Sequence, residues 1–282
     1  GMGVSGGEQG ARRGPSIMPG GDLEVFNLVK PMLEVISAKV NGEPCTAYMG
    51  KGAAGNYVKM VHNGIEYAIM QLISEAYDLL RKGANLTNEQ LYEVFKRWNE
   101  GEMNSFLIEI TRDIFQQKDD VTDGFLVDKI LDKAGAKGNG KWTSEEAMEI
   151  GVSSQTIDTA GTSRILSAYK DERVKASELY AKEEVKTPED TELFIKEVGD
   201  ALYLSTLISY AQGLALLVKA SEEYQFEIPL KDVVKIWRGG CIIRSVLLEK
   251  FYTAYSADPN LSNILLNQEI SEIVKSKIQS LR

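Results

Sequence analysis

The chain has 282 residues, 43% of them hydrophobic, and its 32 Lys and Arg against 41 Asp and Glu give a formal charge of −9 at pH 7. A chain of this length buries about three quarters of the surface that it exposes when unfolded, so it can form one large core or two smaller ones. The negative charge argues against nucleic acid or an anionic membrane as the main partner, because both attract clustered positive charge.

The N-terminal part of the chain is punctuated by glycine and proline. Residues 1–21 have no helical period, so we expect a loop there. Residues 22–40 have a helical pattern. Within it, Pro31 is compatible only with the start of a new helical segment, because an internal proline removes a backbone hydrogen bond and clashes with the preceding turn. Residues 45–49 form a short strand candidate, which completes a small α/β-like opening.

From Asn56 onward the sequence predicts an almost entirely helical fold. A long helix is expected over residues 56–82. Another begins at Thr87, because Gln90 three residues later gives the spacing of a capping box. Glycine, asparagine, proline or aspartate separates the further helices that we expect, near residues 103–117, 125–134, 144–150, 157–169, 188–223, 231–237, 241–255 and 268–280. The fold class is therefore mainly α, with one large helical domain.

Residues 201–218 carry no charge and reach the lower limit of the length that a membrane-spanning helix needs. Polar residues such as Ser205 and Gln212 interrupt this run, and strongly charged sequence flanks it on both sides. Helices that are apolar all round also occur in the cores of large proteins. We therefore expect a buried core helix and no membrane partner.

The residues that commonly bind metals are scarce. Cys45 and Cys241 are far apart and fit no Cys/His spacing typical of a zinc site or a disulfide framework. His62 is the only histidine, which leaves little material for a His-based metal site or a His-centred triad. No N-terminal stretch has the form of a signal peptide. We expect no metal and a reducing, cytoplasmic compartment.

Three glycine-rich motifs could bind an anion. Residues 1–6 and 50–55 both match GxGxxG, but the first has no preceding strand and the second has no following parallel strand, so neither completes the βαβ unit of a dinucleotide site. Residues 135–142 come close to a phosphate-binding loop but place Trp142 where a Ser or Thr is needed. The lysines of this loop, Lys137 among them, still suit a phosphate or carboxylate. The alternative is an ordinary surface loop.

The long predicted helix has one polar face. At 100° per residue, Lys59, His62, Asn63 and Glu66 fall within an arc of roughly 100°, with Tyr67 at its margin. The simplest interpretation is a solvated stripe. However, the glycine after Asn63 costs on the order of 1 kcal/mol relative to alanine inside a helix, so something should offset it. If the face is partly desolvated, its Lys and Glu form a plausible base and acid pair, because burial lowers the pKa of lysine and raises that of a carboxyl.

Six segments, which span the chain in order, carry a resemblance to a known family. They are VSGGEQGARRGPSIMPGG at 4–21, GNYVKMVHNGIEY at 55–67, SFLIEIT at 105–111, KGNGKWT at 137–143, YKDER at 169–173 and IWRGGCIIRS at 236–245. Together they resemble 6-phosphogluconate dehydrogenase, decarboxylating. The resemblance implies NADP-linked oxidative decarboxylation of 6-phosphogluconate to ribulose 5-phosphate and CO2, a step of the pentose phosphate pathway. It also implies a homodimer, in which a Rossmann domain precedes a large helical domain.

The resemblance also implies roles for particular residues. Lys59 would be the general base that takes the proton of the C3 hydroxyl, and Glu66 the acid that protonates C1 of the enediol after CO2 departs. The substrate would be held at its carboxylate end by Ser5, Gly6 and Gly7, at its hydroxyls by His62 and Asn63, and at its phosphate by Tyr67, Lys137 and Arg164.

The chain departs from the family pattern at both ends. The family has its nucleotide fingerprint upstream of the VSGG segment, so we expect residues 1–53 to be the end of an NADP-binding α/β domain that lacks most of the cofactor site. Residues 54–282 would be the helical substrate-binding and dimerisation domain, without the family's C-terminal tail, which lends an Arg and a His to the partner subunit. We therefore expect little activity from the chain alone. A smaller departure is Asn139, where the family usually has Thr.

Two alternatives remain. A non-enzymatic helical oligomerisation or scaffold protein could keep the family fold, although such a protein needs none of the side chains of Ser5, Lys59, Glu66 and Lys137. Another β-hydroxyacid dehydrogenase would share the Lys/Asn pattern of the long helix but not the KGNGKW and WRGGCIIR segments. Titration with 6-phosphogluconate discriminates the scaffold from an enzyme with a surviving site.

Overall fold

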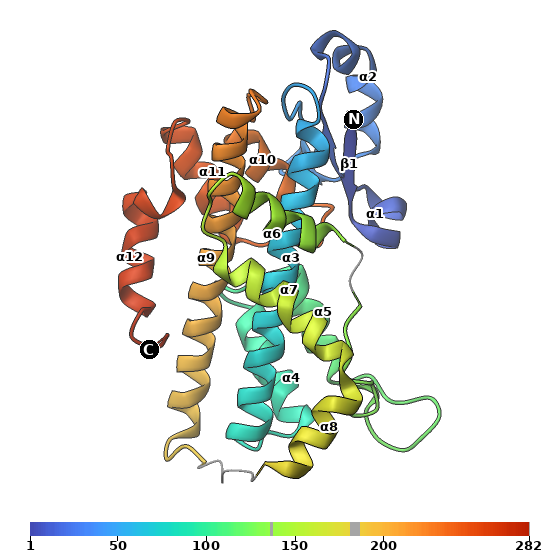
Figure 1. Ribbon diagram of the computed structural model, residues 1–282, viewed down its shortest axis with the longest axis vertical. Helices are drawn as coiled ribbons and strands as arrows, with labels where there is room; N and C mark the ends of the chain where they lie inside the picture. Colours follow the sequence, from blue (N-terminus) through green and yellow to red (C-terminus); the bar gives the residue numbers. More distant parts are fainter. Residues whose placement is uncertain (136–137, 181–186, 282) are drawn as a thin grey trace.

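The computed structural model describes residues 1–135, 138–180 and 187–281. A small unit of strands and short helices lies at one end of these residues, and a large assembly of helices makes up the rest (Figure 1). The expected fold class, mainly α with a short α/β segment in front, is confirmed. The polar face of the long helix lies where the two parts meet, because strands β1 and β2 of the small unit both contact that helix.

The N-terminal unit holds two small antiparallel pairs of strands. Its elements are β1 (Met2–Ser5), α1 (Gly7–Arg13), β2 (Ser16–Pro19), α2 (Leu23–Ile36), β3 (Lys39–Val40) and β4 (Glu43–Pro44). β1 pairs with β2, and Ser5 lies opposite Ser16. The prediction of a loop over residues 1–21 was wrong. Strands of four residues are too short to show a clear period, and in β2 both faces are buried, so it has no polar alternation.

Two further predictions in this unit need correction. Helix α2 is continuous, capped by the side chain of Asp22, and Pro31 lies inside it rather than at the start of a new segment. The carbonyl that loses its helical partner at this proline belongs to Asn27, which is exposed, so water can replace the bond. The expected strand at 45–49 is reduced to one bridge, between Thr46 and Ile17, and β4 ends just before it.

The helical part begins with α3 (Ala54–Asp78), which continues into a π-helical turn, η1 (Leu79–Gly83). The other elements are α4 (Asn88–Asn99), α5 (Phe106–Ile114), the 3-10 turn η2 (Leu126–Asp128), α6 (Asn139–Glu149), α7 (Gln155–Ala168), α8 (Lys170–Leu179), α9 (Thr191–Glu223), α10 (Leu230–Trp237), α11 (Leu247–Ala257), the 3-10 turn η3 (Ile264–Leu266) and α12 (Gln268–Lys277). The capping box at Thr87 is confirmed, since Thr87 and Gln90 exchange both hydrogen bonds.

Three helix predictions differ from the structure. Residues 125–134 form only the short turn η2 rather than a helix. The helix expected over 241–255 begins at Leu247, because Ser245 instead forms a strand-like bridge with Ser105 and the chain at 238–243 forms bends and turns. Helix α8, which has no buried residue, was not predicted. Most of its residues are charged, and its few apolar residues give no apolar period.

Helices α3 and α9 pack against each other in the core (Figure 1). Val61 and Ile65 of α3 are fully buried, and a side chain at Gly213 of α9 would come within 2.5 Å of Ile65 Cδ1. By length and composition, α9 could cross a membrane, and 67% of its apolar window is buried inside the protein. The expectation of a buried core helix around residues 201–218 is thus confirmed.

The glycine inside α3 permits close packing of α6. A Cβ atom at Gly64 would lie 2.6 Å from Cγ2 and 2.8 Å from Oγ1 of Thr143. The Thr143 hydroxyl donates to the Met60 carbonyl of α3 at 2.9 Å, so the two helices are joined by a hydrogen bond at their closest approach. This contact offsets the helix propensity that glycine loses relative to alanine.

Candidate active site

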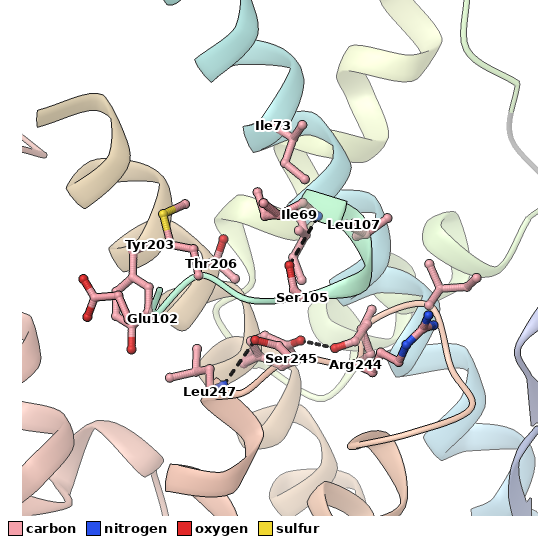
Figure 2. A pocket seen from close by; sticks show the side chains of 15 residues that line it. Ile69, Ile73, Glu102, Ser105, Leu107, Tyr203, Thr206, Arg244, Ser245 and Leu247 are labelled. Carbon is pink, nitrogen blue, oxygen red and sulfur yellow. Dashed lines mark hydrogen bonds between the residues drawn. The ribbon is translucent and has the colours of Figure 1, made fainter. Parts of the chain in front are cut away.

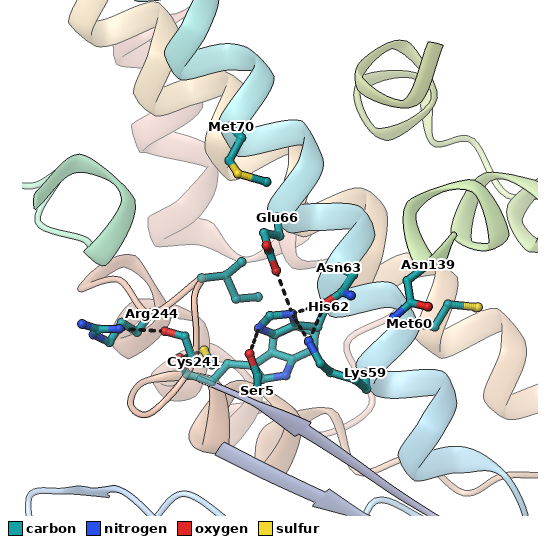
Figure 3. A network of polar contacts seen from close by, with 12 residues as sticks. Ser5, Lys59, Met60, His62, Asn63, Glu66, Met70, Asn139, Cys241 and Arg244 are labelled. Carbon is teal, nitrogen blue, oxygen red and sulfur yellow. Dashed lines mark hydrogen bonds and ion pairs between the residues drawn. The ribbon is translucent and has the colours of Figure 1, made fainter. Parts of the chain in front are cut away.

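The polar residues of α3 form a network with the end of β1, and Figure 3 shows Lys59, His62, Asn63 and Glu66 gathered on the helix face opposite Ser5. His62 is fully buried, and the Glu66 side chain is 19% exposed. The solvated-stripe interpretation is therefore wrong. The N-terminal unit covers this face, which amphipathicity alone could not show.

His62 contacts each of the other polar residues of the network. Its Nε2 lies 3.2 Å from Ser5 Oγ, and its Nδ1 lies 3.1 Å from Asn63 Oδ1 and 3.7 Å from Glu66 Oε2. Burial, with a further contribution from the Lys59 charge, holds the pKa of His62 well below its usual value. The ring is therefore neutral at pH 7, with one donor and one acceptor nitrogen, and the Ser5 hydroxyl takes the role complementary to Nε2.

Lys59 has the environment that a general base requires. Its Nζ donates to Asn63 Oδ1 and lies 3.3 Å from His62 Nδ1. Burial lowers the pKa of Lys59, and the charge of Glu66 opposes this shift. A lowered pKa increases the share of neutral amine that can accept a proton near neutral pH. The expected lowering of the lysine pKa is thus present, whereas the rise expected for the carboxyl of Glu66 stays a prediction.

The Ser5–Gly7 loop has a backbone that only glycine adopts easily. Gly6 and Gly7 have φ angles of +131° and +56°. A Cβ at Gly6 would lie 2.5 Å from the carbonyl oxygen of Gly240, so the loop is packed directly against that backbone. The loop therefore presents main chain rather than bulky side chains beside His62.

The residues expected at the phosphate lie one turn further along α3. The Arg164 guanidinium carbon is 3.8 Å from the centroid of the Tyr67 ring, and Arg164 Nη1 donates to the Gly135 carbonyl at 2.6 Å. A Cβ at Gly140 would come within 2.4 Å of the same Tyr67 ring. Tyr67, Arg164, Gly135 and Gly140 thus converge. Lys137 lies outside the described residues.

A groove leads from the surface to Lys59. It lies between β1, α3 and α6 and has a volume of about 630 Å³, within the range of small-molecule sites. Lys59 and Asn56 line it from α3, and Asn139 and the half-exposed Trp142 line it from α6. The groove is therefore large enough for a sugar phosphate and has both polar and apolar walls.

A second cavity lies deeper among the helices. Figure 2 shows Ile69 and Ile73 of α3, Tyr203 and Thr206 of α9, and the Arg244–Leu247 segment around it. Its volume is about 30 Å³, room for at most a water molecule or two. This cavity is too small for a metabolite. The groove is large enough, but of the described residues expected to contact the substrate it is lined by Lys59 alone, so it reaches the edge of the polar network rather than its centre.

Sequence reasoning missed the residues that close the site from the C-terminal half. The Trp237 ring contacts His62 in an edge-on geometry, with centroids 5.8 Å apart. Cys241 is buried nearby, and burial raises the pKa of its thiol to about 12, so it is not a nucleophile at neutral pH. The IWRGGCIIRS motif was the signal that could have pointed to these residues, but only the fold shows which part of the site they touch.

The described residues do not form a dinucleotide site by themselves. β1 and β2 are antiparallel, and the parallel pairing seen within the described ranges is a single bridge, between Ile17 of β2 and Thr46 on the far side of α2. The second GxGxxG copy packs on the connection after α9, where a Cβ at Gly50 would lie 2.1 Å from the Phe226 carbonyl. Over the same residues, no group of three or more His, Cys, Asp and Glu could hold a metal ion.

Comparison with known proteins identifies the family. Residues 55–282 match the family model described as "6-phosphogluconate dehydrogenase, C-terminal domain", and residues 1–50 match "NAD binding domain of 6-phosphogluconate dehydrogenase". The NADP(+)-dependent, decarboxylating 6-phosphogluconate dehydrogenase of Bacillus subtilis is 54% identical over 283 residues, and a decarboxylating relative from Lactococcus lactis is 50% identical over 284. Each alignment covers all of this chain and 60% of the relative.

A solved structure gives the same result. The 6-phosphogluconate dehydrogenase of Plasmodium falciparum, described as apo and in complex with NADP+ and with 6-phosphogluconate, superimposes with a TM-score of 0.97 at 48% identity. The match covers 100% of this chain and 61% of the Plasmodium chain, so the chain spans about three fifths of the length of these relatives. The chain belongs to the 6-phosphogluconate dehydrogenase family.

Proposed function

We propose that this chain carries the substrate side of a 6-phosphogluconate dehydrogenase site. The reaction is the NADP-dependent oxidative decarboxylation of 6-phosphogluconate to ribulose 5-phosphate and CO2. One observation carries the proposal: on one face of α3, the partly buried Lys59 and Glu66 flank a fully buried His62 that contacts Ser5. Residues 1–53 form the end of the cofactor domain and residues 54–282 the substrate domain.

Lys59 and Glu66 move protons in opposite directions. The neutral amine of Lys59 takes the proton of the C3 hydroxyl, and bound NADP would accept the hydride from C3 as C3 becomes a ketone. After the carboxylate leaves as CO2, Glu66 gives a proton to C1 of the enediol. The two groups lie about two turns apart on one helix face, so both side chains would reach toward neighbouring carbons of the substrate.

The remaining residues hold the substrate along α3. Ser5, Gly6 and Gly7 hold the carboxylate end, His62 and Asn63 bind hydroxyls, and Tyr67 and Arg164 meet the phosphate. The eight residues from Lys59 to Tyr67 rise by about 12 Å, the length scale of an extended sugar acid phosphate. Arg164 already points its guanidinium across Tyr67, so the phosphate would meet a charge held in place by the protein.

The assembly state and compartment belong to the same proposal. A homodimer is supported by exposed apolar residues on α7 and α8, which include Ile165, Leu166 and Leu179. A cytoplasmic location is supported by Cys45 and Cys241, which are both free thiols.

The test of the catalytic role is Lys59→Met in an enzyme form that carries a complete dinucleotide-binding unit. NADPH formation should fall by roughly 10²–10⁴ in kcat, the usual contribution of a positioned general base. The Kd for 6-phosphogluconate should change far less, because the base acts mainly in the transition state. Equal losses in kcat and binding would remove the assignment of Lys59 as base.

A further inference from the structure

The Ser5–Gly7 loop rests on a backbone segment from the far end of the chain. The Gly240 carbonyl accepts the Ser16 N–H at 2.9 Å, and Ser16 is the β2 partner of Ser5. The Ser16 hydroxyl donates to the Ile236 carbonyl at 2.8 Å, where it is fully buried. Gly240 also contacts Gly6. The backbone at Gly240 therefore contacts both strands, β1 and β2, at the end where the Ser5–Gly7 loop begins.

We name Gly239 and Gly240 the glycine seat. A Cβ at Gly240, where φ is +68°, would lie 2.6 Å from the carbonyl carbon of Pro15. A Cβ at Gly239 would lie 2.7 Å from Val40 Cγ2 and 3.1 Å from Cys45 Sγ. The seat is therefore enclosed between the β1–β2 pair and the β3–β4 hairpin, and it has no room for a side chain.

Arg238, which precedes the seat, ties the two parts of the protein together. Its side chain is only 4% exposed and pairs with Glu43 of β4 at 2.6 Å and with Glu249 of α11 at 2.9 Å. Its guanidinium also lies over the Tyr252 ring, 4.4 Å from the centroid. Glu43 belongs to the N-terminal unit, whereas Glu249 belongs to the helical part. Of these two ion pairs of Arg238, only the pair with Glu43 therefore links the helical part to the N-terminal unit, which carries the Ser5–Gly7 loop.

We propose that Arg238 is a positioning residue that, through its ion pair with Glu43, sets the Ser5–Gly7 loop for the carboxylate of the substrate. This inference rests on the proposed function. Glu249 and Tyr252 hold the guanidinium of Arg238 in place on the helical side. The ion pair with Glu43 then holds the β3–β4 hairpin against the glycine seat. The seat in turn fixes Gly6 and Ser16. Arg238 touches no substrate itself.

The fold does not depend on this ion pair alone. The N-terminal unit also packs on the start of α3, where a Cβ at Gly55 would lie 2.2 Å from the Met18 carbonyl. Lys235 pairs with Glu43 as well, at 3.3 Å. Glu43 and Glu249 are both well exposed, at 39% and 46%, so removing either charge costs little stability. Glu43→Gln and Glu249→Gln are thus a matched pair of variants.

The test compares two ligands on the full chain by titration calorimetry. 6-Phosphogluconate has a carboxylate at C1, whereas glucitol 6-phosphate has the same phosphate and the same C2–C5 hydroxyls but an uncharged CH2OH group at C1. Glu43→Gln should weaken 6-phosphogluconate binding on the order of tenfold, because a small displacement of a binding group is costly, and should leave glucitol 6-phosphate unchanged. Glu249→Gln should leave both ligands unchanged, with a similar midpoint of thermal unfolding in both variants.

Other outcomes would overturn the inference. If Glu43→Gln weakens both ligands equally, or if Glu249→Gln has the same effect as Glu43→Gln, Arg238 has only a general structural role. If neither variant changes 6-phosphogluconate binding, the ion pair does not position the loop. Failure of the unmodified chain to bind 6-phosphogluconate would instead reject the proposed function, so the two failures are distinguishable.

Discussion

His62 is buried beside the ammonium group of Lys59. The same site contains a hydroxyl, an amide and a carboxylate, so the ring can be neutral and still have hydrogen-bond partners. A charged imidazole there would be desolvated and close to a second cation. The pKa of His62 is therefore lower in the folded chain than in the unfolded one, and this difference links stability to pH.

Stability should fall as the pH drops below about 6.5, the ordinary pKa of histidine, because only the unfolded chain then binds a proton at this ring. Between pH 6.5 and 5.5 the slope of the unfolding free energy approaches about 1.4 kcal/mol per pH unit. Urea unfolding at a series of pH values measures it. His62→Gln is the control, since the chain has no other histidine and the slope should largely disappear. An unchanged slope in that variant would show that other groups cause it.

At this scale the sequence predicted the helix face but not its surroundings. The 100° turn per residue placed Lys59, His62 and Glu66 together correctly, because α3 is regular over this stretch. Whether the face was solvated depended on Ser5 and Trp237, which are separated from it by many residues. Helical periodicity predicts the direction in which a side chain points from the helix axis. The burial of that side chain depends on which distant segments pack against the same face.

Among the elements, α3 and α6 meet at a glycine whose replacement should be costly. Gly64→Ala gains helix propensity, worth about 1 kcal/mol, but its methyl group overlaps Thr143, which typically costs about 1–3 kcal/mol. We therefore expect Gly64→Ala to lower the free energy of unfolding or to leave it unchanged. Denaturant unfolding measures this difference.

Gly161→Ala is the matched control. Gly161 lies inside α7, and a Cβ there would meet no atom within 4 Å. This variant should be more stable than the wild type by roughly 0.5–1 kcal/mol, because alanine is the better helix former. If Gly64→Ala stabilised the protein as much as Gly161→Ala does, the close α3–α6 contact would be refuted.

The elements that could be predicted were those with strong local signals. The capping box fixed the start of α4, and the amphipathic run of α10 gave its bounds to within a residue. β1 and β2 lacked such signals, since they are short, glycine-flanked and stabilised by contacts with α3 and the segment after α10. Residues 125–134 have a weak helical pattern, but only η2 forms there.

At the scale of the whole molecule, the candidate site is assembled from three distant segments. β1 supplies Ser5, α3 supplies Lys59 and Glu66, and α7 supplies Arg164. The close contacts of the glycine seat and of Gly55 bring the first two segments together, and the Tyr67–Arg164 contact adds the third. The family resemblance predicted this set, whereas physical reasoning from the sequence reached only the part on α3.

The most direct test of the account is calorimetric titration of the chain with 6-phosphogluconate in the presence and absence of inorganic phosphate. We expect saturable binding at one site per chain, weakened by phosphate. Arg164→Met should reduce affinity, while Arg97→Met, which removes an exposed surface charge paired with Glu192, should not. Absence of saturable binding, or binding unaffected by phosphate and by Arg164→Met, would contradict the account and favour a scaffold that keeps only the fold.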